Sequence, residues 1–256
     1  MIFKIFRILF ACLLFLKSSN ICSQDTAAHI DPSKPTNLYN RLSNNIEYNF
    51  LRSGNRTFGY RANFVWASPG KHHSAQVELP LLYATSSKKW GLSDIRIRYY
   101  WIPYRNYSRK PGAFGLVFDS YMPTGNYEDG LGRGRLIAAP GLYTAFIFSK
   151  ISIFPIISYL YNGVIMDNKI SENNKKSFNG YIVQSIMVYR FNKKSYIDCT
   201  PGFMKNSYTN NGRNDVVLEG NYLYMVKKNK IQIGCFARRY FYGRNTTLRA
   251  SIRIYF

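Results

Sequence analysis

The sequence predicts an all-β protein, a transmembrane antiparallel β-barrel of about twelve strands that follows a cleaved N-terminal signal peptide. Three observations lead to this prediction. Apolar and polar residues alternate over long segments, short and long connections alternate in the second half of the chain, and the last residues belong to an alternating segment. Ten or fourteen strands are the neighbouring alternatives, because segment boundaries are uncertain by a few residues.

Alternation of apolar and polar residues predicts strands with one face of each kind. In residues 56–66, for example, Phe58 lies on the apolar face and Arg61 on the polar face. The expected strands are roughly 46–52, 56–66, 74–84, 92–102, 113–122, 135–148, 151–162, 178–191, 195–203, 215–226, 230–241 and 246–256. The sixth and seventh of these are more uniformly apolar than the others. They also contain Pro140 and Pro155, although proline cannot donate a hydrogen bond to a neighbouring strand.

The length of these segments favours a barrel in lipid over a soluble sandwich. Strands of soluble proteins average about 5–6 residues, whereas membrane strands need about 9–11. Lipid covers the apolar outer face of such a barrel, and the polar face lines the interior. Closure is required, because an open edge would leave backbone groups unpaired in hydrocarbon at several kcal/mol each.

The lengths of the connections predict which end of the barrel faces the periplasm. Short ones are expected at 149–150, 192–194 and 227–229, and long polar ones at 123–134, 166–177 and 204–215. With twelve strands, the short connections and both termini fall on one side. Short periplasmic turns opposite long outer loops are typical of outer-membrane barrels.

The first residues have the three-part layout of a secretory signal peptide. Lys4 and Arg7 precede a short apolar run, and small residues follow it. Cleavage is expected after Ser23, which makes 1–23 the signal peptide and 24–256 the barrel. Cys22 offers a lipoprotein alternative, but the residue before it is bulkier than lipid attachment normally requires. Export of this kind places the protein in the outer membrane of a Gram-negative bacterium.

The sequence predicts neither a cofactor nor a metal site, and it does not predict an enzyme. Cys199 and Cys235 are interpreted as small apolar strand residues without a disulfide, because their strands are not expected to be adjacent. The pair His72 and Ser74 matches a phospholipase pattern in two residues only, and a plain turn is the favoured interpretation. Residues 123–134 are rich in glycine but lack the ending of a nucleotide-binding loop, which indicates a hairpin loop.

The formal net charge of +22 is spread along the chain rather than gathered in a tail. No nucleic-acid-binding motif accompanies it, so nucleic acid is not expected as a partner. The polar faces carry the residues expected to line the lumen: Arg61, Glu78, Asp94, Arg96, Arg98, Asp119, Glu219, Arg249 and Arg253. Two interpretations stay open. A ring of unpaired arginines would favour anions, whereas a ladder of salt bridges would fill a narrow lumen.

The final segment, 246–256, ends on an aromatic residue in mid-strand. Its apolar face ends with Ile252, Ile254 and Phe256, which resembles the terminal signal that the barrel-insertion machinery recognises. A last strand of this kind must pair with the first to close the cylinder, so it cannot fray as soluble termini do.

The middle of the chain resembles a known family. The segments GLSDIRIRYYW (91–101), FGLVFDSYMPTGNYEDGLGRGRLIAAPGLYTAF (114–146) and PIISYLYNG (155–163) carry the pattern. They are similar to outer-membrane proteins of the MetA pathway of phenol degradation, which are described as transporters. The resemblance consists of strand and turn signals. It implies a membrane barrel that takes up hydrophobic or aromatic compounds.

These observations together predict a passive channel for small solutes, hydrophobic or aromatic compounds or anions. A closed, non-conducting barrel that displays its outer loops as a structural or adhesive surface is the alternative. The expected partners are outer-membrane lipid and lipopolysaccharide, the barrel-insertion machinery and the small-molecule solute.

Overall fold

The computed structural model describes residues 31, 34–52, 54–163, 177–207, 212–227 and 230–256. The predicted signal peptide, 1–23, lies outside these residues. No helix among the described residues is long and apolar enough to span a membrane.

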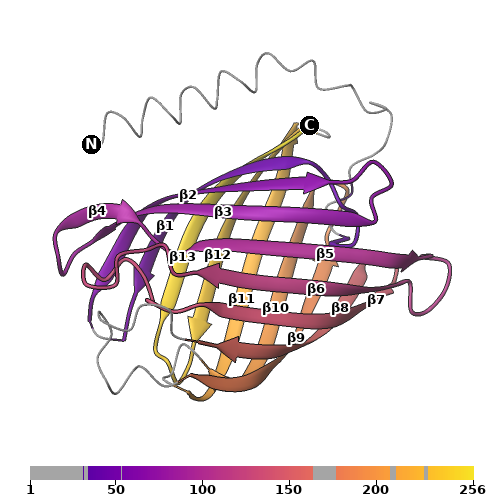
Figure 1. The fold of residues 1–256 in the computed structure, drawn as a ribbon. Coiled ribbons are helices and arrows are strands. Elements are labelled where there is room, and N and C mark those ends of the chain that lie inside the picture. The colour runs from indigo at the N-terminus through magenta and orange to yellow at the C-terminus, as the bar shows by residue number, and fades with distance from the viewer. Residues whose placement is uncertain (1–30, 32–33, 53, 164–176, 208–211, 228–229) are drawn as a thin grey trace. The chain divides into compact units, whose positions relative to one another are not determined.

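The described chain forms one antiparallel sheet that closes on itself (Figure 1). Its strands are β1 (Arg41–Phe50), β2 (Arg56–Ala67), β3 (His73–Ala84), β4 (Lys89–Leu92), β5 (Ile95–Arg105), β6 (Ala113–Met122), β7 (Ile137–Ile147), β8 (Ile151–Asn162), β9 (Phe178–Arg190), β10 (Ser195–Ser207), β11 (Arg213–Lys227), β12 (Ile231–Tyr240) and β13 (Thr246–Tyr255). Because β1 pairs with both β2 and β13, the sheet has no free edge there. β4 pairs with the loop end of β3 and lies in line with β5, which pairs with the rest of β3, so β4 and β5 together form one strand of the wall. Twelve strands therefore make the wall, and the predicted closed barrel is confirmed.

The polarity of the wall is inverted relative to a soluble protein. Ile46 is 71% exposed on the outer face, whereas its neighbour Glu47 is 1% exposed and points inward. The same alternation places Phe58, Phe64 and Leu142 on the outer face. Apolar side chains therefore form the surface that lipid contacts, and the charged residues of the strands lie inside.

Two of the predicted boundaries are wrong. β1 begins at Arg41 rather than at residue 46, because Arg41 pairs with both Val65 and Tyr255. The start was missed because Asn44, a polar residue, occupies an outward position. The predicted long loop at 204–215 is largely strand, since β10 continues to Ser207 and β11 starts at Arg213.

The two prolines inside strands are accommodated by local gaps in one ladder. Pro140 in β7 has a partner in β6, and Pro155 in β8 has a partner in β9. Neither has a partner in the ladder between β7 and β8, where the register continues unchanged on both sides of each gap. The missing proline N–H therefore interrupts pairing without breaking the wall.

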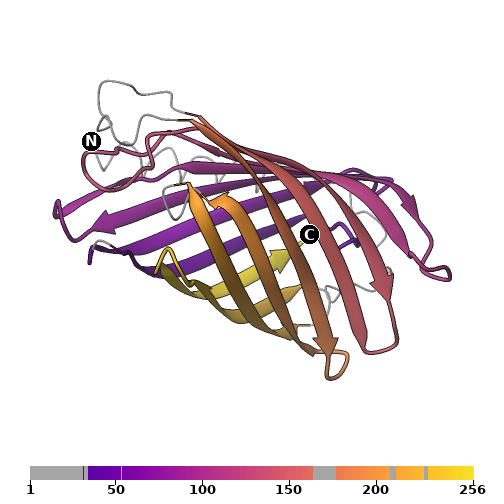
Figure 2. The same cartoon turned by 90° about the horizontal axis from the view of Figure 1, so that it is seen from below.

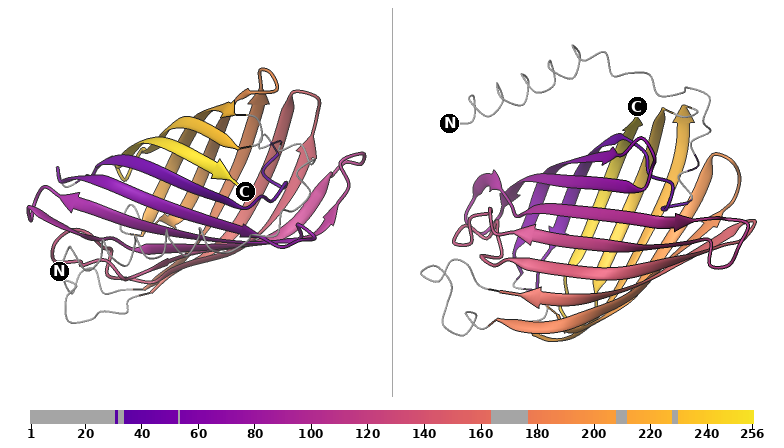
Figure 3. Two further views of the ribbon diagram at one scale, coloured as in Figure 1. Left: turned by 90° about the horizontal axis from the view of Figure 1, so that it is seen from above. Right: turned by 45° about the vertical axis from the view of Figure 1, so that its right-hand side comes forward.

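The two ends of the barrel differ. The terminal end carries residues 34–40, Phe256 and the short turns 148–150 and 191–194. The loop end carries the 123–136 connection, and the predicted loop 166–177 lies almost wholly outside the described residues. Figures 2 and 3 show the strands running obliquely between these ends.

Cys199 and Cys235 are free thiols on the outer face. Their strands, β10 and β12, are separated by β11, so the expectation that they are not on adjacent strands is confirmed.

The inverted polarity predicts a strong difference between the two faces of the wall. Leu142→Lys at the middle of β7 places a charge on the outer surface, and we expect it to lower the free energy of unfolding in lipid by about 2–4 kcal/mol. Gln184→Lys, at the middle of β9 on the inner face, is the matched control and should cost far less. Urea titration in liposomes measures both, and equal losses would contradict the assignment of faces.

Candidate channel lumen

A continuous ladder of charges crosses six strands on the inner wall. It begins at Arg249 in β13, whose Nε lies 2.9 Å from Glu47 Oε2 in β1. Glu47 in turn accepts from Arg61 Nε in β2 at 2.7 Å, and Arg61 Nη1 lies 3.1 Å from Glu78 Oε2 in β3. Arg96 in β5 follows, with its Nη1 3.5 Å from Glu78 Oε1. Each carboxylate so far lies between two guanidinium groups.

The ladder ends on β6. Asp119 accepts from Arg96 Nε at 2.8 Å, and Arg98 Nε lies 3.5 Å from its other oxygen. A separate pair continues the pattern on the far side of β13, where Arg238 Nε donates to Glu219 Oε2 at 2.7 Å. Strand register explains the arrangement, because Glu47 lies directly opposite Arg249, Glu78 opposite Arg96, Asp119 opposite Arg98 and Glu219 opposite Arg238.

These contacts decide between the two interpretations of the lumen charges. In the described chain the arginines of the ladder are paired with carboxylates, and they do not form an unpaired ring. Glu47 is the most enclosed member, with a side chain that is fully buried. Removing one partner of a buried pair leaves an uncompensated charge, so the ladder also stabilises the wall.

Two of the expected lumen residues have other roles. Asp94 follows β4 at the loop end, where its carboxylate accepts from the backbone N–H of Gly125 and of Arg133 at 3.2 and 2.8 Å. Burial raises the pKa of Asp94, although Arg133 and these two hydrogen bonds oppose the shift. Asp94 therefore holds the long loop in place. Arg253 lies near the terminal end, and its Nη1 is 3.5 Å from Gln232 Oε1.

A basin of about 680 Å³ opens at the loop end of the barrel. Seven arginines line it against two carboxylates: Arg52, Arg61, Arg96, Arg133, Arg135, Arg238 and Arg249 against Glu47 and Asp94. Several of the arginines also lie over aromatic rings, for example Arg133 at 4.4 Å from the centre of Tyr121 and Arg135 at 5.6 Å from that of Phe178. Arginines still outnumber carboxylates at the basin when the ladder carboxylates that pair with them from outside its lining are counted, so the mouth carries a positive surplus.

A second, narrower cavity of about 120 Å³ lies deeper in the barrel. It shares Arg96, Tyr121, Arg238 and Tyr240 with the basin, so the two spaces meet at these side chains. Its other side mixes apolar side chains, among them Ile156 and Ile182, with polar ones such as Gln184. The path thus narrows as it leaves the loop end.

An apolar cluster occupies the lumen at the terminal end. Its buried members are Leu38, Ala67, Ile102, Ala113, Val117, Tyr143, Ala145, Phe154, Ile156, Val188, Tyr196 and Leu223. Val117 and Ile156 also line the narrow cavity, so the cluster forms the floor of that space. The sequence did not reveal this closure, although the uniformly apolar segments 135–148 and 151–162 were its signal.

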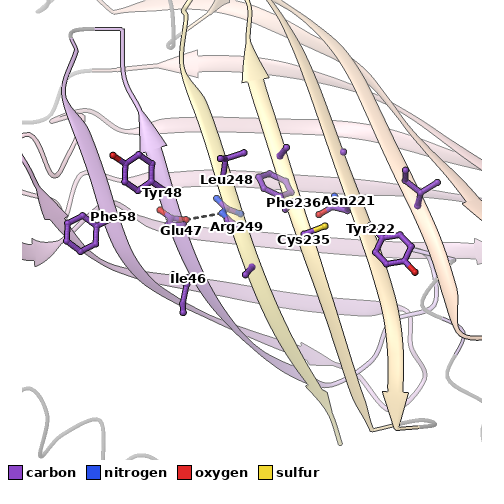
Figure 4. Close-up of a pocket in the computed structure, with 14 residues that line it drawn as sticks. Ile46, Glu47, Tyr48, Phe58, Asn221, Tyr222, Cys235, Phe236, Leu248 and Arg249 are labelled. Atoms are coloured by element: carbon purple, nitrogen blue, oxygen red, sulfur yellow. Dashed lines mark hydrogen bonds and ion pairs between the residues drawn. The ribbon is translucent and has the colours of Figure 1, made fainter.

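A larger hollow, of about 730 Å³, lies on the outer face and is not part of the lumen (Figure 4). Small side chains at Gly220, Cys235, Ala237 and Ala250 form its floor, and Tyr222 and Leu248 stand at its margins. Figure 4 also shows the Glu47–Arg249 pair of the ladder.

The remaining sequence candidates occupy structural positions. His72 Nδ1 lies 2.8 Å from the carbonyl oxygen of Ile102, and Ser74 is buried on the inner face. At the end of the chain, Ile252, Ile254 and Phe256 are exposed on the outside. Recognition of these three by the insertion machinery stays a prediction. Among the described residues, no group of three or more His, Cys, Asp and Glu side chains could hold a metal ion.

Comparison with solved structures identifies the type of barrel. The KdgM porin in complex with disordered oligogalacturonate superposes with a TM-score of 0.56 at 12% identity, over 84% of this chain and 99% of that chain. The NanC porin gives a TM-score of 0.57 at 8% identity, over 83% of this chain and 98% of that chain. At such identities the similarity shows the fold alone. The chain has the fold of these porin barrels.

No family model and no curated protein sequence matches the chain. The resemblance to transporters of the MetA pathway of phenol degradation therefore stays a prediction.

The ladder predicts that Glu47 is critical for stability. Glu47→Gln removes the charge that faces both Arg61 and Arg249, and we expect the free energy of unfolding to fall by about 3 kcal/mol. Asp129→Asn is the matched control. It breaks the exposed Lys89–Asp129 pair, 2.8 Å long, and should cost less than about 1 kcal/mol. Urea unfolding in liposomes compares the two, and similar losses would argue against the ladder as a stabilising element.

Proposed function

We propose that the protein is a passive channel of the outer membrane for small solutes and that it favours anions. The arginine-lined basin, which continues into a cavity inside a closed barrel, is the observation that carries this proposal. Clefts lined by one sign of charge raise the local concentration of ions of the opposite sign. Because the ladder arginines are paired, the anion preference rests on the surplus of arginine over carboxylate around the basin and not on an unpaired ring.

The barrel lies in the outer membrane of a Gram-negative bacterium, with the loop end outward and the terminal end toward the periplasm. Short turns at the end where β1 begins and β13 ends, and a long loop at the other end, support this orientation. Outer-membrane lipid and lipopolysaccharide contact the apolar outer face and the basic loops. Ile252, Ile254 and Phe256 serve as the signal for the barrel-insertion machinery.

The solute class follows from the lining of the lumen. Guanidinium groups at the mouth attract carboxylates, sulfonates or phosphates. Tyr121, Tyr127 and Tyr240 add aromatic surface to the basin, which suits an apolar or aromatic body on the same solute. Uptake of uncharged aromatic compounds is supported only by the sequence resemblance.

A second function is favoured by one observation. The apolar cluster at the terminal end fills the lumen in the present conformation, as expected of a non-conducting barrel that displays its loops. A lack of current through correctly folded protein in planar bilayers would support this alternative.

The charge of the basin predicts ion selectivity. Arg133→Glu combined with Arg135→Glu changes two basin cations to anions, and we expect the reversal potential in a KCl gradient to shift toward cation preference. The double variant Arg238→Glu with Glu219→Arg exchanges one ion pair without changing net charge, so its selectivity should match the parent. If the first variant kept the parent's selectivity, ions would not pass through the basin.

A further inference from the structure

The segment that precedes β1 lies at the terminal end of the barrel, beside the C-terminus (Figure 2). We call residues 34–40 the strap. Although the strap has no regular secondary structure beyond a turn, Thr36 is 2% and Leu38 7% exposed. Two buried side chains in a short irregular segment show that the strap is packed into the barrel and does not trail away from it.

Leu38 belongs to the apolar cluster that closes the lumen. The other members come from the inner faces of β2, β5, β6, β7, β8, β9, β10 and β11. Leu38 is 7% exposed and belongs to the same buried cluster as these inward side chains, so it packs on the inner side of the ring of strands. Leu38 therefore adds to the apolar closure of the lumen at the terminal end.

Polar contacts fix the strap to the turn between β5 and β6. The Tyr107 hydroxyl donates to Asn37 Oδ1 at 2.7 Å and lies 2.8 Å from the Thr36 hydroxyl. The Lys34 ammonium lies 5.3 Å from the centre of the same ring. Burial raises the pKa of Tyr107, so its hydroxyl keeps the proton that it donates.

Other contacts hold the strap, and Asp31 ahead of it, elsewhere on the rim. Asp31 accepts from Arg190 Nη1, at the end of β9, at 3.3 Å. The Tyr39 ring lies edge-on to that of Tyr255, at the end of β13, with centroids 6.1 Å apart. The turn after β5, the end of β9 and the end of β13 are spread around the barrel, so the chain crosses the mouth rather than following its rim.

One buried hydroxyl lacks a hydrogen bond in the closed arrangement. The Tyr143 hydroxyl is buried in the cluster and has no hydrogen-bond partner among the described residues. A buried hydroxyl without a partner costs about 1–3 kcal/mol. Entry of water on opening would satisfy this group, which lowers the free energy needed to leave the closed state.

We propose that the strap is a displaceable stopper of the periplasmic mouth, in which Leu38 seals the apolar cluster and Tyr107 holds the strap in place. This rests on the proposed channel function, because release of the strap is the step that admits solute. The lumen then has a permanently open, cationic basin at the loop end and a closed mouth at the periplasmic end. Transport is controlled from the periplasmic side.

Labelling of a buried thiol tests the strap independently of current. Ala113→Cys, which is fully buried in the cluster, serves as the reporter in the full-length chain. The native cysteines, Cys12, Cys22, Cys199 and Cys235, are replaced by alanine. A charged, membrane-impermeant thiol reagent is applied, and heat-modifiable gel mobility confirms that each variant is a folded barrel.

We expect slow labelling of the reporter when the strap is intact. Leu38→Asp should accelerate labelling at least about tenfold, because labelling follows the population of the open state. Tyr107→Phe keeps the ring and removes the hydroxyl, so it should accelerate labelling to a smaller extent. This milder variant keeps the proposal testable if Leu38→Asp does not fold. Leu131→Asp is the matched control, since Leu131 is buried in a separate small cluster with Leu82 and Ala84 at the loop end and should leave the rate unchanged.

The outcomes separate the two proposals. Unchanged labelling in both strap variants would overturn the stopper, as would steady current through a parent barrel whose reporter stays protected. Faster labelling together with higher conductance supports both proposals. Faster labelling with no current in any variant supports the stopper and removes the channel function.

Discussion

The pairing of β1 with β13 is the constraint on which the rest of the structure depends. Ten residues of β1, from Arg41 to Phe50, find partners in β13. Without this seam two edges would face hydrocarbon, where each unpaired backbone group costs several kcal/mol. The Glu47–Arg249 contact lies across the same seam, so the charged ladder inside the barrel reinforces the closure that the backbone makes.

Closure and inverted polarity divide the interior into two parts. The wall from β13 through β1 to β6 carries the ladder, and arginines of the ladder line the space that opens toward the loop end. The inner faces of β7 to β10 carry many apolar side chains instead. Phe154 and Val188 belong to the cluster at the terminal end, whereas Ile137 and Leu160 belong to a smaller cluster toward the loop end. In the channel that we propose, charge is selected at one mouth and Leu38 seals the other by hydrophobic contact.

Much of this could be predicted from the sequence, because period-two alternation reports directly on the two faces of a strand. Arg61, Glu78 and Arg96 were assigned to the inner face on that basis. Their pairing could not be predicted, since it depends on register, and a shift of one residue would turn each side chain to the other face. The apolar closure was missed because β8 is apolar on both faces around Pro155. Inward Phe154 and outward Ile157 therefore look alike in the sequence. The strap was missed because a short polar segment such as PTNLYN carries no periodic signal.

The most direct test of the account measures which face of β13 meets lipid. Nitroxide labels are placed one at a time at Leu248, Arg249, Ala250, Ser251 and Ile252 in protein reconstituted into liposomes. Collision rates with oxygen, which concentrates in lipid, and with a water-soluble nickel chelate are then compared at each site. The account predicts strict alternation, with oxygen dominant at Leu248, Ala250 and Ile252 and relatively more access for the chelate at the other two. Shielding of Leu248 and Ile252 from both reagents would place them in a dry core and contradict the inverted barrel.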